Sequence, residues 1–247
     1  MKTLAPSIIA LLALLLSTVL VAEDQPLRVE HFVGEARANG NGELVYTEHH
    51  RREWRGDEPV RMLTTYKLPD DSVLAEREVR YLERGVVEFA LNDKRIGYME
   101  GAERDNGRLR LFSRENESAS KREDTIRLRD ELVVDAGFDR MVALNWESLM
   151  AGESVSARFA VPSRRSDYRC EISKQREWEL DGEPVVTFRM RFRGLLLSLF
   201  ADPVDVTYHR ESKALVRYEG ISNLRDESGD NYQVVIDLPL AKRSFEQ

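Results

Sequence analysis

Apolar residues recur at every second position over much of this chain, and this alternation constrains its fold more than any other feature. Residues 185–192 show it most clearly, because Val186, Phe188, Met190 and Phe192 alternate with a second set of side chains. Successive residues of a strand point to opposite faces of a sheet, so a period of two indicates a half-buried β-strand. The same period returns at residues 44–54 and 61–67. The pattern predicts a mainly β fold.

Short turn signals separate these segments. Gly40-Asn41-Gly42, Pro69-Asp70-Asp71 and Asp181-Gly182 each lie between two alternating stretches, and such residues favour tight turns. We expect about thirteen strands, which short connections would pair antiparallel with their neighbours. So many strands rarely form one flat sheet. We therefore predict a large curved antiparallel sheet, a half-barrel or a barrel.

One segment departs from the alternation. Residues 138–151 carry apolar side chains at roughly helical spacing, namely Phe138, Met141, Val142, Leu144, Trp146 and Leu149. Asp135 or Asp139 is suited to cap the start of a helix here, and Gly152 to end it. The segment predicts one α-helix whose apolar face covers the sheet.

A second apolar segment, residues 195–200, follows Gly194 and precedes Pro203. We interpret it as a short apolar helix or turn. Core packing is the ordinary explanation for both segments. The functional alternative is that they line or gate a cavity for an apolar ligand, because ligand sites favour concave and mostly apolar surfaces. The predicted ligand-binding residues are Phe138, Trp146, Leu195, Leu196, Leu199 and Phe200.

The N-terminal residues have the pattern of a secretion signal. Lys2 precedes an apolar run over residues 7–21, and the small Ala22 precedes two acidic residues. The run is shorter than the roughly 20 residues that span a bilayer. We expect residues 1–22 to be a cleavable signal peptide and residues 23–247 to be a single antiparallel β domain in the periplasm.

The charge argues against a nucleic-acid-binding protein, and the cysteine content excludes an internal disulfide. The formal net charge is −7, with acidic and basic residues mixed along the chain, so the field expected of a nucleic-acid-binding protein is missing. Cys170 is the one cysteine of the chain and alternates with polar residues. It cannot form an internal disulfide, and we expect it to be a small core residue.

No motif for catalysis, a metal or a cofactor emerges, so we predict no catalytic residue, no metal and no cofactor. His49 and His50 are adjacent, and on a strand they would point to opposite faces. His50 shares a face with Glu48 and Arg52, and a Glu–His pair is able to perform acid–base chemistry. The ordinary interpretation is a solvated polar strip with a salt-bridged histidine.

Three blocks of the sequence carry a resemblance to a known family. They are Gly42-Glu43-Leu44-Val45-Tyr46-Thr47-Glu48-His49-His50, Val134-Asp135-Ala136-Gly137-Phe138-Asp139 and Tyr218-Glu219-Gly220-Ile221-Ser222-Asn223. Together with the signal peptide, they resemble a family of uncharacterised exported proteins of Gram-negative bacteria. By architecture alone, the order of strands with a covering helix resembles the lipoprotein-carrier (Lol-type) half-barrel. That likeness implies an apolar concavity for acyl chains.

The sequence supports hypotheses from different classes. The first is a non-enzymatic periplasmic binding or carrier protein for a lipid or other apolar ligand. The second is a cofactor-independent hydrolase or isomerase that uses Glu48, His50 or a pair of carboxylates in a cleft. The third is an envelope interaction protein, whose exposed sheet edge pairs with another envelope protein.

Overall fold

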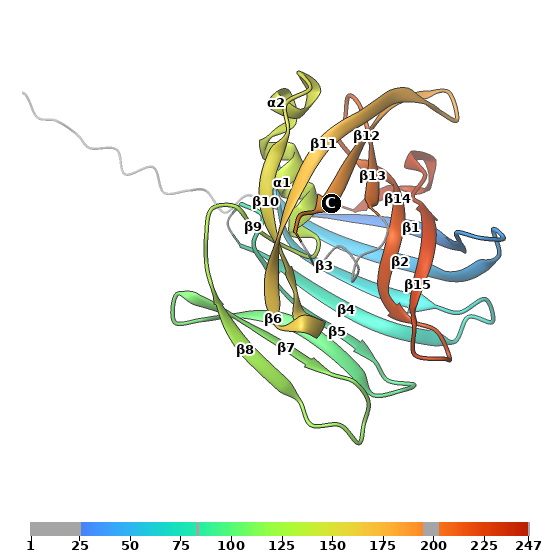
Figure 1. Ribbon diagram of the computed structural model, residues 1–247. Helices are drawn as coiled ribbons and strands as arrows, with labels where there is room; N and C mark the ends of the chain where they lie inside the picture. Colours follow the sequence, from blue (N-terminus) through green and yellow to red (C-terminus); the bar gives the residue numbers. More distant parts are fainter. Residues whose placement is uncertain (1–25, 83, 195–202, 247) are drawn as a thin grey trace, which may run out of the picture.

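The computed structural model describes residues 26–82, 84–194 and 203–246, and most of them belong to one strongly curved β-sheet (Figure 1). Sixteen strands are present in the described part of the chain. The first eight strands are β1 (Leu27–Ala38), β2 (Leu44–Arg55), β3 (Glu58–Lys67), β4 (Val73–Tyr81), β5 (Val87–Asp93), β6 (Tyr98–Asp105), β7 (Arg108–Arg114) and β8 (Arg122–Arg127). The others are β9 (Leu132–Val134), β10 (Val155–Val161), β11 (Ser166–Leu180), β12 (Glu183–Phe192), β13 (Val204–His209), β14 (Leu215–Arg225), β15 (Asn231–Asp237) and β16 (Ser244–Glu246). The prediction of a mainly β protein is confirmed.

The sheet is built by two runs of neighbouring strands that meet at β1. Its order is β8-β7-β6-β5-β4-β3-β2-β1-β15-β14-β13-β12-β11-β10-β9, and β16 also pairs with β1. Each hairpin-connected pair is antiparallel, as the short turns predict. The exception is β9 with β10, which are parallel and are joined through the helical segment. A parallel pair needs such a crossover because its strands run in the same direction.

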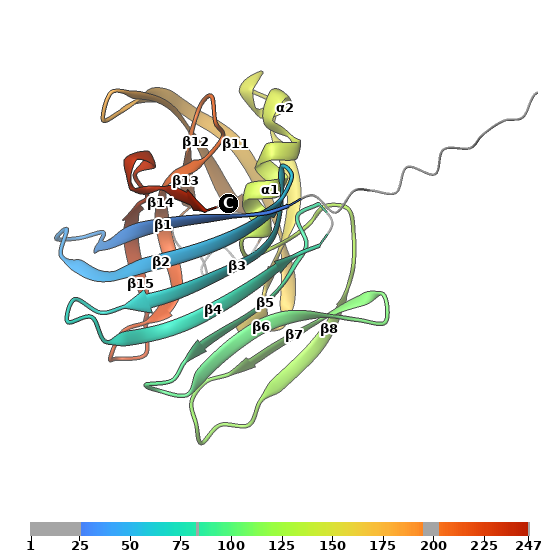
Figure 2. The ribbon, with the colours of Figure 1, turned by 180° about the vertical axis from the view of Figure 1, so that it is seen from behind.

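The curvature brings the two ends of the sheet toward each other. The backbone N–H of Val134 on β9 donates a 3.1 Å hydrogen bond to the carbonyl of Gly85, just before β5. Strand β11 contacts β8, and the 3₁₀ turn η1 (Pro162–Arg164) contacts β6 and β7. Figures 1 and 2 show β1–β8 as one curved wall and β10–β15 as a second wall opposite it. The result is a barrel-like fold with an interior.

Apolar side chains from each wall form a core. In β5 the burial alternates strictly, with Val87, Phe89, Leu91 and Asp93 facing inward. One hydrophobic cluster joins β1–β7 to β9 and β15, and a second joins β10–β13 to the helical segment. The apolar side chains at every second position, which identified the strands in the sequence, therefore also pack between the walls.

The predicted single helix is two short helices. They are α1 (Gly137–Leu144) and α2 (Trp146–Met150), and Asn145 between them has a non-helical backbone at φ −110° and ψ 17°. Its side-chain amide donates a 2.8 Å hydrogen bond to the carbonyl of Met141, which competes with the helical pattern. The expectation of a side-chain cap from Asp135 or Asp139 is wrong, because the residue at the start of α1 is Ala136 and no side-chain cap bond is formed.

The expected end of the helical segment is confirmed. Gly152 has φ +90°, and its N–H donates to the carbonyl of Leu149 at 3.0 Å. A left-handed backbone of this kind ends helices and favours glycine. Helix α1 lies between the walls, close to β9 and β10, and α2 contacts β11 (Figure 1). The helices therefore cover the end of the second wall.

A glycine contact fixes α1 against the first wall. A Cβ built on Gly137, the first residue of α1, would lie 1.9 Å from the carbonyl oxygen of Gly85. The two backbones touch at a distance that no side chain permits. This contact gives a physical reason for glycine in the Val134–Asp139 block, and it sets the depth at which the next residue, Phe138, enters the interior.

Candidate functional site

A cavity of about 220 Å³ lies between the two walls. Strands β1 to β6 contribute one side, and β10, β12 to β15 and the start of α1 contribute the other. Its apolar lining is rich in aromatic side chains and consists of Phe32, Met62, Tyr66, Phe89, Phe138, Phe159, Met190, Val204, Val206, Leu215, Tyr218, Ile236 and Leu238, among others. Ligand sites in barrel-like folds are concave and mostly apolar in this way.

Charged and polar side chains also line this cavity, and several of them come from one row across the first wall. The row follows the strand register, in which Phe32 pairs with His50, His50 with Thr64, Thr64 with Arg77, Arg77 with Leu91 and Leu91 with Glu100. Directly opposed residues share a face of the sheet. The row therefore places an imidazole, a guanidinium and a carboxyl group on the same inner surface.

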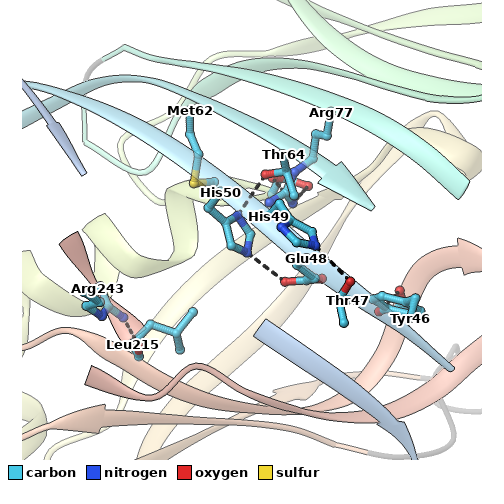
Figure 3. Close-up of polar contacts among 12 residues, drawn as sticks. Tyr46, Thr47, Glu48, His49, His50, Met62, Thr64, Arg77, Leu215 and Arg243 are labelled. Atoms are coloured by element: carbon cyan, nitrogen blue, oxygen red, sulfur yellow. Dashed lines mark hydrogen bonds and ion pairs between the residues drawn. The ribbon is translucent and has the colours of Figure 1, made fainter. Parts of the chain in front are cut away.

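His50 is held by hydrogen bonds at both ring nitrogens (Figure 3). Nε2 lies 3.0 Å from Oε2 of Glu48, and Nδ1 lies 2.9 Å from Oγ1 of Thr64. A carboxylate accepts, so Nε2 carries the proton and the Thr64 hydroxyl donates to Nδ1. The ring of Phe32 stacks on the imidazole at a centroid distance of 4.4 Å. The interpretation of this face as a solvated polar strip is wrong, because Glu48 and His50 are both buried.

Burial decides the charge of His50. Loss of hydration lowers the pKa of the imidazole below its ordinary value of 6.5, although its hydrogen bond to the Glu48 carboxylate opposes the change. The nearby positive charges of Arg77 and Arg52 lower it further. His50 is therefore a neutral ring at pH 7, and it positions the carboxylate of Glu48 at the cavity wall.

An ion pair joins the first wall to the segment before α1. Nη1 of Arg77 on β4 donates to both carboxylate oxygens of Asp135, at 3.0 and 3.3 Å. Oδ1 of Asp135 also accepts from the backbone N–H of Ala136 at 2.6 Å. Asp135 adopts φ +45°, a strained conformation for a non-glycine residue. The ion pair, which lies at the cavity, explains how this conformation is maintained.

Two further carboxyl groups line the cavity with neutral partners. Glu100 accepts a 2.9 Å hydrogen bond from the hydroxyl of Tyr98, and Asp139 accepts a 2.7 Å bond from the hydroxyl of Tyr208. Burial raises the pKa of Glu100 to about 7. Burial also raises the pKa of Asp139, against a lowering influence from Arg52. The cavity thus contains acids whose ionisation is made less favourable by their surroundings.

The structure divides the predicted ligand-binding residues into three groups. Phe138 is part of the cavity lining. Trp146 packs instead in the second hydrophobic cluster, where its ring meets Phe188 and Tyr208 edge-on at 5.4 and 6.2 Å. Leu195, Leu196, Leu199 and Phe200 lie outside the described residues.

Sequence reasoning missed Arg77 and Glu100 as members of this site. The available signal was the alternation of faces along a strand. Arg77 and Glu100 lie at strand positions that share a face with buried apolar residues. An inward charge in an otherwise apolar face is informative because such groups are rarely buried without a role. Asp135 and Asp139 were among the carboxylates considered for a pair in a cleft, and both line the cavity.

Comparisons with known proteins identify no function. No protein-family model and no curated protein matches the chain. Among solved structures, the chain is similar to a β-barrel-like protein of a domain of unknown function, DUF1849, from Brucella abortus. The match covers 90% of this chain and 98% of that chain, with 8% sequence identity and a TM-score of 0.42. The description of the fold therefore depends on the strands and their pairing.

In residues 26–82, 84–194 and 203–246, no helix has the length and apolar character needed to cross a membrane. Within the same ranges, no three His, Cys, Asp or Glu side chains gather in a way that would hold a metal ion.

Proposed function

We propose that this protein is an exported, non-enzymatic binding or carrier protein, which holds a small ligand with an apolar body in the cavity between its two walls. The observation that supports this proposal is the cavity itself, about 220 Å³ with an aromatic and aliphatic lining. Export rests on the signal-like residues 1–22. We also propose that the chain belongs to the uncharacterised exported family that its three sequence blocks resemble.

The size of the cavity limits the ligand. Sites for drug-sized molecules usually measure roughly 300–1,000 Å³, and this cavity is smaller. A single medium-length acyl chain or a small ring system fits this range better than a complete lipid with two chains. Burial of the apolar body would supply most of the affinity, at about 25 cal/mol for each Å² removed from water.

The proposal is tested by mass spectrometry of the protein purified from a bacterial periplasm. Under native conditions we expect one small molecule bound to each chain, and denaturing extraction should release it. In Ala160→Leu the larger side chain enters the cavity, because Ala160 on β10 lines it, so the bound molecule should be lost. Ala90→Leu is the matched control, since Ala90 lies in a separate surface hollow of the first wall.

The result that contradicts binding is equally plain. If the wild-type protein carries the mass of the chain alone, and added eight-carbon amphiphiles bind neither wild type nor Ala90→Leu, the cavity is not a ligand site. If Ala160→Leu retains the molecule, the ligand occupies a different part of the protein.

A second candidate function has one observation in its favour. Glu48 and His50 form a hydrogen-bonded acid–histidine pair in the cavity wall, which is the geometry that a cofactor-independent hydrolase or isomerase requires. The engagement of Nδ1 by Thr64 opposes it, because a general base needs a nitrogen that faces the substrate. Hydrolysis of a p-nitrophenyl octanoate ester, abolished in Glu48→Gln, would support this function, and a rate equal to the buffer background would reject it.

A further inference from the structure

Arg52 has an environment that differs from that of every other cation described in the cavity wall. It faces inward from β2, and its side chain is 12% exposed. Its guanidinium lies over the rings of Phe32 and Trp54, at 4.9 and 5.5 Å from their centroids. Among the described residues it makes no hydrogen bond, and its Nε is buried without a partner. An arginine offers five N–H donors, and this one uses none of them.

The nearest carboxylates are already engaged. Glu30 lies 4.0 Å from Nη1 of Arg52, which exceeds hydrogen-bond distance. Its two oxygens accept from Arg243 Nη1 at 2.7 Å and from Trp54 Nε1 at 3.1 Å. Asp139 accepts from Tyr208, and no ion pair of 4.0 Å or less joins it to Arg52 within the described ranges. Arg52 therefore shares its neighbourhood with a second guanidinium and lacks an acceptor of its own.

Arg77 is the other arginine of the cavity lining, and its Nε is also buried without a partner. It is also inward-facing and lines the cavity, but Asp135 accepts two of its hydrogen bonds. A buried charge without hydrogen bonds costs several kcal/mol in general. The 4.0 Å ion pair with Glu30 and the two ring contacts leave the N–H donors of Arg52 without an acceptor, and a molecule bound in the cavity would supply one.

We infer that Arg52 anchors the acidic head group of the ligand, so that the molecule held in the cavity is an amphiphile with an eight-carbon-scale apolar body and a carboxylate or phosphate monoester. This inference rests on the proposed binding function and specifies its ligand class. Two N–H donors of one guanidinium face match the two oxygens of such a group. Phe32 and Phe138, which line the same cavity, are suited to contact the apolar body.

The opposite ligand class, an organic cation, is less well accommodated. Four carboxyl groups line the cavity, namely Glu48, Glu100, Asp135 and Asp139. Each of them already accepts at least one hydrogen bond, from His50, Tyr98, Arg77 and Tyr208 respectively. Arg52, by contrast, makes no hydrogen bond within the described structure, so the charged lining residue that lacks any hydrogen-bond partner is a donor.

The test is a titration of the delipidated full-length mature protein with four probes of equal chain length. They are octanoate, octyl phosphate, octan-1-ol and octylammonium, and binding is followed by calorimetry. We expect octanoate or octyl phosphate to bind about ten- to hundredfold more tightly than octan-1-ol, as for other hydrogen bonds to a charged group. In Arg52→Met this preference should disappear, while octan-1-ol binds as before.

Arg51→Met is the matched control, because Arg51 is the adjacent residue on the opposite face of β2 and pairs with Glu53. It should keep the full preference for the acidic probes. The stability of the ligand-free protein separates anchoring from a structural role: Arg52→Met should unfold at the same or a higher denaturant concentration than wild type. Arg52→Lys provides a second variant that retains the charge and should keep part of the preference.

The outcomes separate the two proposals. If octan-1-ol or octylammonium binds wild type as tightly as octanoate and octyl phosphate, the assignment of Arg52 is wrong and the cavity remains a ligand site. The assignment also fails if Arg52→Met retains the preference. If none of the four probes binds, the proposed binding function fails, and the ligand class inferred from it fails as well.

Discussion

Glu100 allows the electrostatic description of the interior to be tested by stability measurements alone. Its side chain faces the cavity from β6, and the residue is only 3% exposed. Its hydrogen bond comes from the neutral hydroxyl of Tyr98, so no cation within hydrogen-bond distance compensates its charge in the described structure. Burial therefore raises the pKa of this carboxyl from an ordinary 4.5 to about 7. We expect replacement by glutamine to remove the cost of ionising it.

The sign and size of the effect follow from the two pKa values. A raised pKa means that between pH 4.5 and 7 the folded protein binds more protons than the unfolded chain, so stability falls as the pH rises. The difference of about 2.5 corresponds to about 3 kcal/mol at about 1.4 kcal/mol per pKa unit. Glu100→Gln should therefore gain about 3 kcal/mol over wild type at pH 8 and less than about 1 kcal/mol at pH 5.

Urea unfolding of both proteins at pH 5 and pH 8 measures this difference. The constant effect of the substitution cancels when the two pH values are compared, because it is present at both. Glu227→Gln, at an exposed residue of the last hairpin turn, shows what removal of one surface carboxylate does. If the free-energy difference between wild type and Glu100→Gln is the same at pH 5 and pH 8, Glu100 is not the uncompensated acid that its position indicates.

Three further predictions test the packing. Trp146→Ala should lower the free energy of unfolding by about 3–5 kcal/mol, as for other large aromatic residues in a core, whereas Leu144→Ala, at a residue that is 59% exposed, should change it by less than about 0.5 kcal/mol in chemical denaturation. Gly137→Ala should lower the free energy of unfolding by about 3 kcal/mol or more, because its Cβ would overlap a backbone carbonyl. Gly40→Ala, whose Cβ meets nothing within 4 Å, should leave the stability unchanged. Equal thermal stability of the two variants would contradict the close approach of α1. Burial raises the pKa of Cys170 to about 12, so the thiol should react with a disulfide reagent only after unfolding, and rapid labelling of the native protein at pH 8 would place it at the surface.

Much of the fold could be predicted from the two-residue period of the apolar side chains and from the residues that favour turns. The alternation at residues 185–192 predicted β12, and Asp181-Gly182 correctly marked the turn that precedes it. Gly152 correctly marked the end of the helical segment. These predictions succeed because they depend on local geometry, in which a side chain's face or a residue's φ angle is set by near neighbours.

Predictions that depend on long-range contacts were less accurate. The break at Asn145 arises from its side-chain bond to Met141, which helical spacing does not reveal. The apolar pattern made Trp146 and Phe138 equivalent, yet both pack in the second hydrophobic cluster and only Phe138 of the two also lines the cavity. Which apolar residue faces a cavity depends on the distance between the two walls. The spacing of apolar residues in the sequence contains no information about that distance.

Charged and apolar residues lie side by side on the inner face of the first wall. On the inner faces of β4, β5 and β7, residues such as Val79, Leu91 and Leu111 show that this surface accepts apolar side chains. Arg77 and Glu100 are direct neighbours of Leu91 across the strands, and both line the cavity. Apolar replacements of buried charges often stabilise a protein, so packing gives no reason for a charge at Glu100, whereas Arg77 also holds Asp135 in place. Their coincidence with the cavity supports the view that this part of the interior is arranged for a ligand, at some cost in stability.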